Sequence, residues 1–216
     1  MSAVWRSRDP QRAMRLLLQE LTHRVDGEFS AAIRILSSAA ALTHSDETRR
    51  TLVAVQARLE NFARVHHVLQ APEIQTDVDG CSYLQQLCVA ISLSKLECLG
   101  IKLEVLDREC PIDSEQCWRL GIIVAELVAT AARRSFVSSP GRISVDITRR
   151  GALIRCRVED NGVARADEGN RGARIVDALA RELHGAVEQH QRREGCVATV
   201  IFPAAGSHWS GTAALG

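Results

Sequence analysis

The run CWRLGIIVAELVATAARR, from Cys117 to Arg134, decides the fold class because its apolar residues lie on nearly every side of a helix. A helix of this kind is buried on several sides, so we expect it at the centre of a domain. Pro111, Asp113 and Ser114 lead into the run, and these residue types are typical of a helix start.

Segments with the two-residue alternation of half-buried strands surround this central helix. We expect strands at Ile101–Leu106, Arg142–Thr148, Ala152–Glu159, Ala186–His190 and Cys196–Phe202. Two further helices are predicted over Cys81–Lys95 and Gly172–His184, with Gly185 as the cap of the second. This order of elements predicts an α/β sandwich with helices on one face of a mixed sheet.

The first third of the chain follows a helical period instead. From Pro10 to about Leu42, apolar residues recur at steps of three and four and form one stripe. After a turn at residues 43–46, a second series repeats with the spacing of a coiled-coil seam: Leu52, Val55, Leu59, Phe62, His66 and Leu69. Two antiparallel helices cannot enclose such seams alone, so we expect a homodimer with a four-helix bundle.

The predicted fold class is therefore α+β, with an N-terminal antiparallel helical hairpin followed by an α/β sandwich. The expected domains are residues 1–72 for the dimerising hairpin and 78–203 for the sandwich, and 204–216 form a flexible tail.

Composition excludes several classes of function. The 27 Lys and Arg residues nearly balance the 26 Asp and Glu residues, which argues against duplex nucleic acid or an anionic membrane as the main partner. Aromatic residues make up 4% of the chain, which is few for stacking on single-stranded nucleic acid. No apolar run has the length of a membrane span.

The seven cysteines indicate a reducing compartment. They form no CxxC pair, no secretory leader precedes them, and no metal-ligand spacing occurs among them. We expect buried cysteines that serve as small apolar side chains, in a cytoplasmic protein.

His23 is the first candidate for chemistry. It lies two residues from both Leu21 and Val25, about 200° around a helix from each, and so projects away from the apolar stripe. Such an imidazole fits either a reactive group or ordinary surface.

The residues around His23, LQELTHRVDGEF, resemble the phosphoacceptor box of a family of histidine kinases, the second dimerisation-and-phosphotransfer family, related to the HWE kinases. That box typically reads Glu-x-x-His-Arg-Val-x-Asn. The other boxes of the family have counterparts in the same order: Leu120–Phe136 is similar to the N box, Val158–Gly162 and Gly172–Val176 to the two glycine boxes, and Ala198–Pro203 to the last strand. The resemblance implies the ATPase (Bergerat) fold of histidine kinases for the sandwich.

The resemblance also implies a bacterial two-component protein. His23 would take the γ-phosphoryl group of ATP and pass it to an aspartate in the receiver domain of a response regulator. A neutral, exposed imidazole is a competent nucleophile near neutral pH. Arg24 would attract phosphate oxygens, and Glu126 matches the acid of the N box.

The nucleotide site that the resemblance implies holds ATP and Mg²⁺. Asp160 matches the carboxylate that accepts a hydrogen bond from the adenine amino group. The other residues implied to bind nucleotide are Asn161, Gly162, Gly172 and Arg174, with free N–H groups near Gly172 suited to phosphates. Thr130 takes the place of the asparagine that ligates Mg²⁺, and its hydroxyl is a shorter ligand. The resemblance also allows Arg133 and Arg134 as phosphate contacts, but we expect them at a solvated helix end.

Three hypotheses follow, because the N box departs from the family at Ala125 and Thr130. The first is a histidine kinase that phosphorylates His23 from ATP. The second is an ATP-independent histidine phosphotransferase, or pseudokinase, in which the sandwich serves as a scaffold. The third is a binding module that sequesters a regulator.

Overall fold

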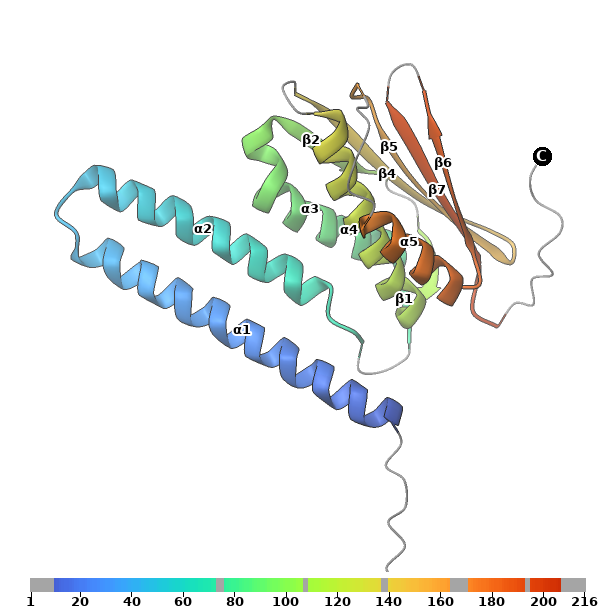
Figure 1. The fold of residues 1–216 in the computed structure, drawn as a ribbon, viewed down its shortest axis with the longest axis horizontal. Coiled ribbons are helices and arrows are strands. Elements are labelled where there is room, and N and C mark those ends of the chain that lie inside the picture. Colours follow the sequence, from blue (N-terminus) through green and yellow to red (C-terminus); the bar gives the residue numbers. More distant parts are fainter. Residues whose placement is uncertain are drawn as a thin grey trace, which may run out of the picture. The chain divides into compact units, whose positions relative to one another are not determined.

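A computed structural model describes residues 10–72, 76–106, 109–136, 140–163, 171–192 and 195–206 (Figure 1). The chain forms two compact units, Met1–His67 and Val68–Gly216, called here the hairpin unit and the C-terminal unit. Most of the predicted loop from Asp160 to Arg171, the predicted helix break at 138–139 and residues 207–216 of the predicted tail lie outside the described residues.

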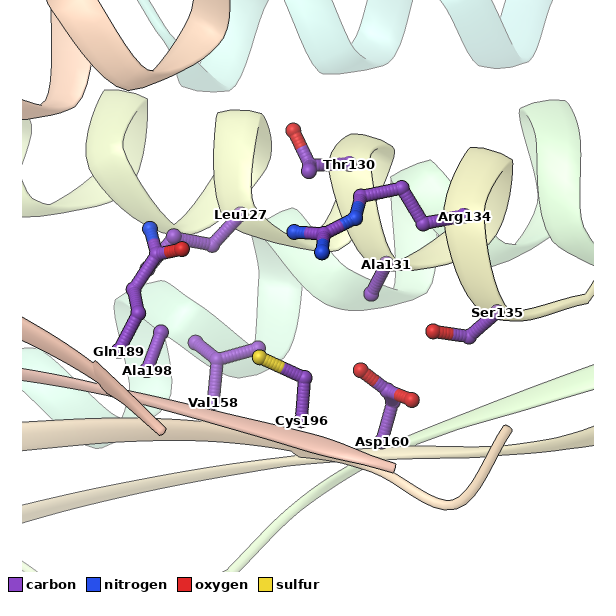
Figure 2. Close-up of a pocket in the computed structure, with 10 residues that line it drawn as sticks. All are labelled: Leu127, Thr130, Ala131, Arg134, Ser135, Val158, Asp160, Gln189, Cys196 and Ala198. Atoms are coloured by element: carbon purple, nitrogen blue, oxygen red, sulfur yellow. The ribbon is translucent and has the colours of Figure 1, made fainter. Parts of the chain in front are cut away.

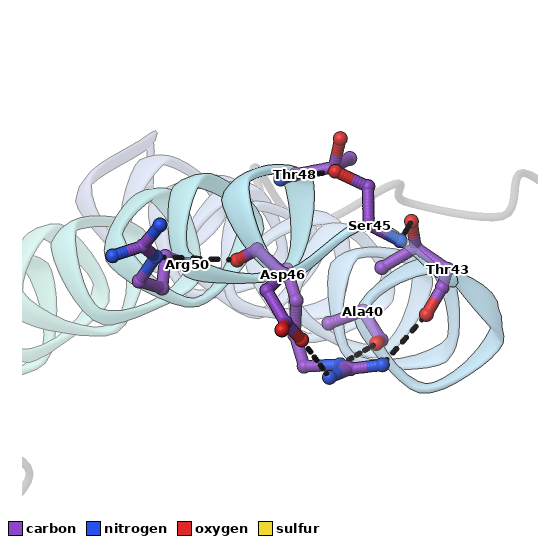
Figure 3. Close-up of polar contacts among 7 residues, drawn as sticks. Ala40, Thr43, Ser45, Asp46, Thr48 and Arg50 are labelled. Atoms are coloured by element: carbon purple, nitrogen blue, oxygen red, sulfur yellow. Dashed lines mark hydrogen bonds and ion pairs between the residues drawn. The ribbon is translucent and has the colours of Figure 1, made fainter.

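The hairpin unit is built from helix α1 (Pro10–Leu42) and helix α2 (Asp46–Val68), at the predicted places. Arg49 stabilises the turn between them through contacts with Ala40, Thr43 and Asp46, which are labelled in Figure 3. Its guanidinium donates to the carbonyl oxygen of Thr43 at 2.7 Å and to that of Ala40 at 3.4 Å, and it pairs with the Asp46 carboxylate at 2.8 Å. Carbonyl groups that the end of α1 leaves without helical partners are thereby satisfied.

The apolar stripes of the hairpin are open in a single chain. Leu17, Leu21 and Val25 of α1 are 61%, 56% and 37% exposed. The residues of α2, all of which the structure describes, include none that is buried. Helical stability in proteins comes mostly from packing of the apolar face, so these helices need a further surface to pack against.

The C-terminal unit is a five-stranded sheet covered on one face by helices (Figure 1). The strands are β2 (Ile101–Val105), β4 (Gly141–Arg150), β5 (Leu153–Asp160), β6 (Ala186–Gln191) and β7 (Cys196–Pro203), in the order β2-β4-β5-β7-β6. β2 runs parallel to β4 and the other pairs are antiparallel, which confirms the predicted mixed sheet.

Helix α4 (Ser114–Ser135) is the central helix that the sequence predicts. Leu120, Ile123 and Val124 have no exposed surface. The Asp113 carboxylate accepts hydrogen bonds from the N–H groups of Glu115 at 3.0 Å and Gln116 at 3.1 Å, which caps the helix. Helices α3 (Gly80–Ile91) and α5 (Arg171–Glu182) complete the helical layer.

Several predicted boundaries are wrong. The helix expected as far as Lys95 ends at Ile91 and continues as a π-helical turn, Ser92–Leu96, and a 3₁₀ turn, Glu97–Leu99. Gly100, with a φ of 69°, ends this segment in the left-handed conformation that favours glycine.

A small two-stranded sheet was not predicted. Its strands, β1 (Asp77–Asp79) and β3 (Pro111–Asp113), are antiparallel and three residues long. Strands this short carry too few residues for a period of two to be seen in the sequence.

The end of α5 also differs from the prediction. The left-handed residue is His184, with a φ of 54°, rather than Gly185. Gly185 is needed for another reason, because a Cβ atom there would clash with the carbonyl oxygen of Ile201. Close approach to β7 therefore explains this glycine better than the predicted cap.

The cysteine prediction holds for five of the seven thiols. Buried positions are occupied by Cys81, Cys88, Cys110, Cys117 and Cys156. Cys196 is half-buried, and Cys98 is exposed because its 3₁₀ turn lies at the surface. Within the described ranges, none of the helices combines the length and the apolar character that a membrane span requires.

Candidate functional site

His23 lies exposed on α1, as the helical geometry predicts. Arg24, the next residue, is also exposed and stands 3.8 Å from Glu20. Three residues beyond His23, the Asp26 carboxylate forms a 2.9 Å hydrogen bond with Nδ1 of His66 on α2. This contact ties the two helices together close to the turn that carries His23.

The contact between Asp26 and His66 was not predicted. The sequence places His66 in the seam of α2, and the structure finds it half-buried, with its ring centroid 6.0 Å from that of Phe29. Its partner is 40 residues away along the chain. No local pattern in either helix could have indicated this pairing.

A cavity lies between α4 and the sheet of the C-terminal unit (Figure 2). We call it the Asp160 cavity, and it is lined by Leu127, Thr130, Ala131, Arg134, Ser135, Val158, Asp160, Gln189, Cys196 and Ala198. Its volume is about 30 Å³. A water needs about 10–15 Å³ of such space, so the cavity has room for a few waters at most.

Asp160 stands at the end of β5 with 4% of its surface exposed. Its Oδ1 atom accepts a hydrogen bond from the N–H of Gly162 at 3.1 Å. Gly162 is buried, and a Cβ atom there would clash with the carbonyl oxygen of Ser135. The residues of the first glycine box thus pack tightly against the end of α4.

Asn161 does not line the Asp160 cavity, and its side chain instead connects two strands. Its side chain is exposed, and Oδ1 accepts a hydrogen bond from the N–H of Arg142 at 2.7 Å. The bond connects the end of β5 to the start of β4. Nucleotide binding by Asn161 stays a prediction.

Arg134 belongs to the wall of the Asp160 cavity, which corrects the prediction of a solvated helix end. The residue is half-buried, and Figure 2 shows its side chain running alongside α4, across the cavity from Cys196 and Val158 on the sheet. Burial and the negative charge of Asp160 raise the pKa of the Cys196 thiol, while the positive charge of Arg134 lowers it. Both charges therefore act on the same half-buried thiol.

The structure brings together the N box and the start of α5. A Cβ atom at Gly172 would lie 3.0 Å from Oε2 of Glu126 and 3.4 Å from Oγ1 of Thr130. These three predicted residues are neighbours although Gly172 is more than 40 positions from Thr130. Arg174 is exposed on α5.

The residues at the place of the Mg²⁺ asparagine do not fit a divalent cation. The Thr130 hydroxyl accepts a hydrogen bond from the guanidinium of Arg133 at 3.2 Å. A positive charge at that distance from the expected ligand repels a second cation. Ala125, at the other asparagine position, has no side-chain oxygen to contribute.

Sequence reasoning missed several residues of the cavity wall. Gln189 and Ala198 are paired between β6 and β7, and Cys196 begins β7. The register of these strands decides which of their residues face α4. Gln189, Cys196 and Ala198 could have been predicted as lining residues only if the register of these strands had been known.

Comparisons with known proteins point to histidine kinases. Residues 20–95 match the family model HisKA_2, described as "Histidine kinase". No curated protein matches the sequence.

Three solved structures illustrate the likeness. The histidine kinase domain of the blue-light activated kinase EL346 from Erythrobacter litoralis has 18% identity and a TM-score of 0.56, with 82% of this chain and 96% of that one covered. Full-length ShkA in complex with AMPPNP has 17% identity and a TM-score of 0.52, with 89% and 46% covered. A bacterial phosphotransferase has 13% identity and a TM-score of 0.59, with 86% and 94% covered.

These matches confirm the resemblance to histidine kinases and the fold class. The chain has a helical hairpin and the α/β sandwich fold of histidine kinase catalytic domains. It spans less than half the length of full-length ShkA.

Proposed function

We propose that this chain is a histidine-kinase-like protein of two-component signalling, in which His23 carries a phosphoryl group to an aspartate of a response regulator. The observation that carries the proposal is the family match over residues 20–95, which includes His23, together with the exposure of this imidazole on α1. A phosphoacceptor must be reached by two different protein partners in turn, so exposure is a requirement of the role.

The chemistry at His23 is a displacement at phosphorus. A ring nitrogen forms the N–P bond as the P–O bond to the donor breaks, and the imidazole proton leaves to solvent. In the second step a regulator carboxylate forms a P–O bond as the N–P bond breaks, and the freed imidazole takes a proton from solvent. The exposed Arg24 guanidinium offers N–H donors to the phosphoryl oxygens.

We further propose that the protein works as a homodimer through the hairpin unit. The exposed seam residues Leu17, Leu21 and Val25 support this, because a second hairpin would cover them. The seven cysteines are all free, which fits the reducing bacterial cytoplasm.

The phosphoryl donor distinguishes two versions of this function. In the kinase version the donor is ATP, as the family match favours. In the phosphotransferase version it is the aspartyl phosphate of another receiver domain. The contact between Arg133 and Thr130 and the small Asp160 cavity favour the second version, and the fold likeness to a bacterial phosphotransferase agrees with it.

The experiment is a labelling assay on the full chain. Wild type, His23→Gln and His67→Gln are each incubated with γ-labelled ATP and Mg²⁺, and separately with a panel of phosphorylated receiver domains. His67 is the matched control because it is an exposed histidine on the other helix.

We expect acid-labile label on wild type and His67→Gln but not on His23→Gln. Label from ATP selects the kinase version, and label from a receiver domain alone selects the phosphotransferase version. If neither donor labels the wild type, His23 is not a phosphoacceptor and the binding-module hypothesis takes its place.

A further inference from the structure

We infer that Arg134 closes the Asp160 cavity from within: its guanidinium takes up space that a purine base would need. The inference rests on the proposed function in one respect, the identification of the Asp160 cavity with the base site of histidine kinases. It predicts that ATP does not bind while Arg134 is in place, and that His23 receives its phosphoryl group from an aspartyl phosphate.

The first argument is volume. Asp160 and Val158 from β5 and Thr130 from α4 line one cavity, as expected for a base site between the N-box helix and the sheet. Yet the remaining space is about 30 Å³. Arg134 has the longest side chain in the lining, and Figure 2 shows it running alongside α4 with its guanidinium toward Leu127.

The second argument is charge. The Asp160 carboxylate is 96% buried, and a buried charge is costly unless a partner or a set of hydrogen bonds compensates it. The N–H of Gly162 supplies one hydrogen bond. Arg134 is the cationic residue in the cavity lining, and its charge opposes that of Asp160 at the Cys196 thiol.

The third argument is that the main chain leaves no other space at this end of the cavity. Gly162 lies so close to Ser135 that even a Cβ atom would clash with the Ser135 carbonyl oxygen. On the β7 side, a Cβ atom at Gly195 would clash with the carbonyl oxygen of Asp160. Because the main chain is in contact at both places, the flexible Arg134 side chain is the part whose removal enlarges the cavity.

The test measures nucleotide binding, which does not depend on His23. A fluorescent ATP analogue, displaced by unlabelled ATP, is titrated into the full-length wild type, Arg134→Ala and Arg134→Gln. Arg181→Ala is the matched control, because it removes the same charge from an exposed position on α5. Circular dichroism verifies that each variant is folded, and the glutamine variant serves if the alanine variant is not.

We expect both Arg134 variants to bind ATP at least about tenfold more tightly than wild type, a change of about 1.4 kcal/mol. Arg181→Ala should bind like wild type. The inference is overturned if a folded Arg134 variant binds ATP no more tightly than wild type.

The two proposals fail in different ways. Label on wild-type His23 from ATP would overturn the closed cavity while confirming the phosphoacceptor. Absence of label from every donor, combined with tighter binding by the Arg134 variants, would overturn the phosphoacceptor and leave the closed cavity standing.

Discussion

The hairpin unit and the C-terminal unit differ in two properties: how many predicted site residues each has, and how complete its apolar core is in a single chain. The hairpin has residues that resemble a phosphoacceptor box, and its apolar stripe is open, with Leu21 56% exposed in a single chain. The C-terminal unit has a closed core around Leu120 and Val124, but Ala125 and Thr130 stand where the resemblance leads us to expect asparagines. The first unit therefore has the predicted site residues without a complete core, and the second has a complete core without all of the predicted site residues.

The core of the C-terminal unit is where a substitution should cost most. Leu120→Ala on α4 should lower the free energy of unfolding by about 2–5 kcal/mol, because Leu120 has no exposed surface and its removal leaves a cavity. Urea unfolding measures the change. Val89→Ala, at a residue that is 55% exposed, is the control and should change it by less than about 0.5 kcal/mol. Equal effects would contradict a core that is complete in one chain.

The hairpin should respond through association instead. Leu21→Asp should weaken the dimer at least about tenfold, because a charge would replace an apolar side chain in the seam of the bundle. Sedimentation over a range of concentrations measures the dissociation constant. Ser37→Asp, at an exposed residue of α1, is the control.

The unfolding of the C-terminal unit should not change in Leu21→Asp. A wild type that sediments as a monomer at micromolar concentration would contradict the dimer and with it the explanation of the open stripe.

Substitution of Asp79 should have a smaller and pH-dependent effect on the stability of the C-terminal unit. The backbone N–H of Cys110 and the Ser82 hydroxyl donate to this carboxylate and lower its pKa from 3.8 to about 2. Because the folded pKa is the lower one, the stabilisation is present above about pH 4 and is lost as the pH falls towards 2.

Asp79→Asn should therefore lower the free energy of unfolding at neutral pH by about 1–2 kcal/mol, with the difference from wild type vanishing in acid. Thermal unfolding between pH 2 and pH 7 would show it. Asp77→Asn, at an exposed carboxylate of β1, should lack this pH dependence. A constant difference at every pH would contradict the role of the ionised carboxylate.

The contact between Asp26 and His66 should have the smallest effect. Both side chains are about one third exposed, so solvent screens the pair, and its contribution should be about 0.5 kcal/mol. A double-mutant cycle with Asp26→Ala and His66→Ala, followed by urea unfolding, isolates the interaction energy. A coupling above about 2 kcal/mol would show that the hairpin has a tighter internal core than its exposure indicates.

Local patterns predicted most of the fold because each element carries its period within itself. The apolar run in α4, the stripe of α1 and the alternation in β4 and β5 all indicated the correct element within a few residues. The predictions that failed concern short or special segments. Three-residue strands such as β1 have no measurable period, and Gly185 faces the backbone of Ile201, which no sequence pattern shows.

The sequence by itself determined that an exposed histidine stands on the first helix and that a buried helix organises the second unit. These are properties of residue spacing along one element, and spacing is local. Only the tertiary structure decided the place of Arg134. Adjacent arginines at the end of a helix look alike in sequence, but one donates to Thr130 and the other lines the Asp160 cavity. That difference depends on where β5 and β7 lie against α4, which strand pairing sets across distant parts of the chain.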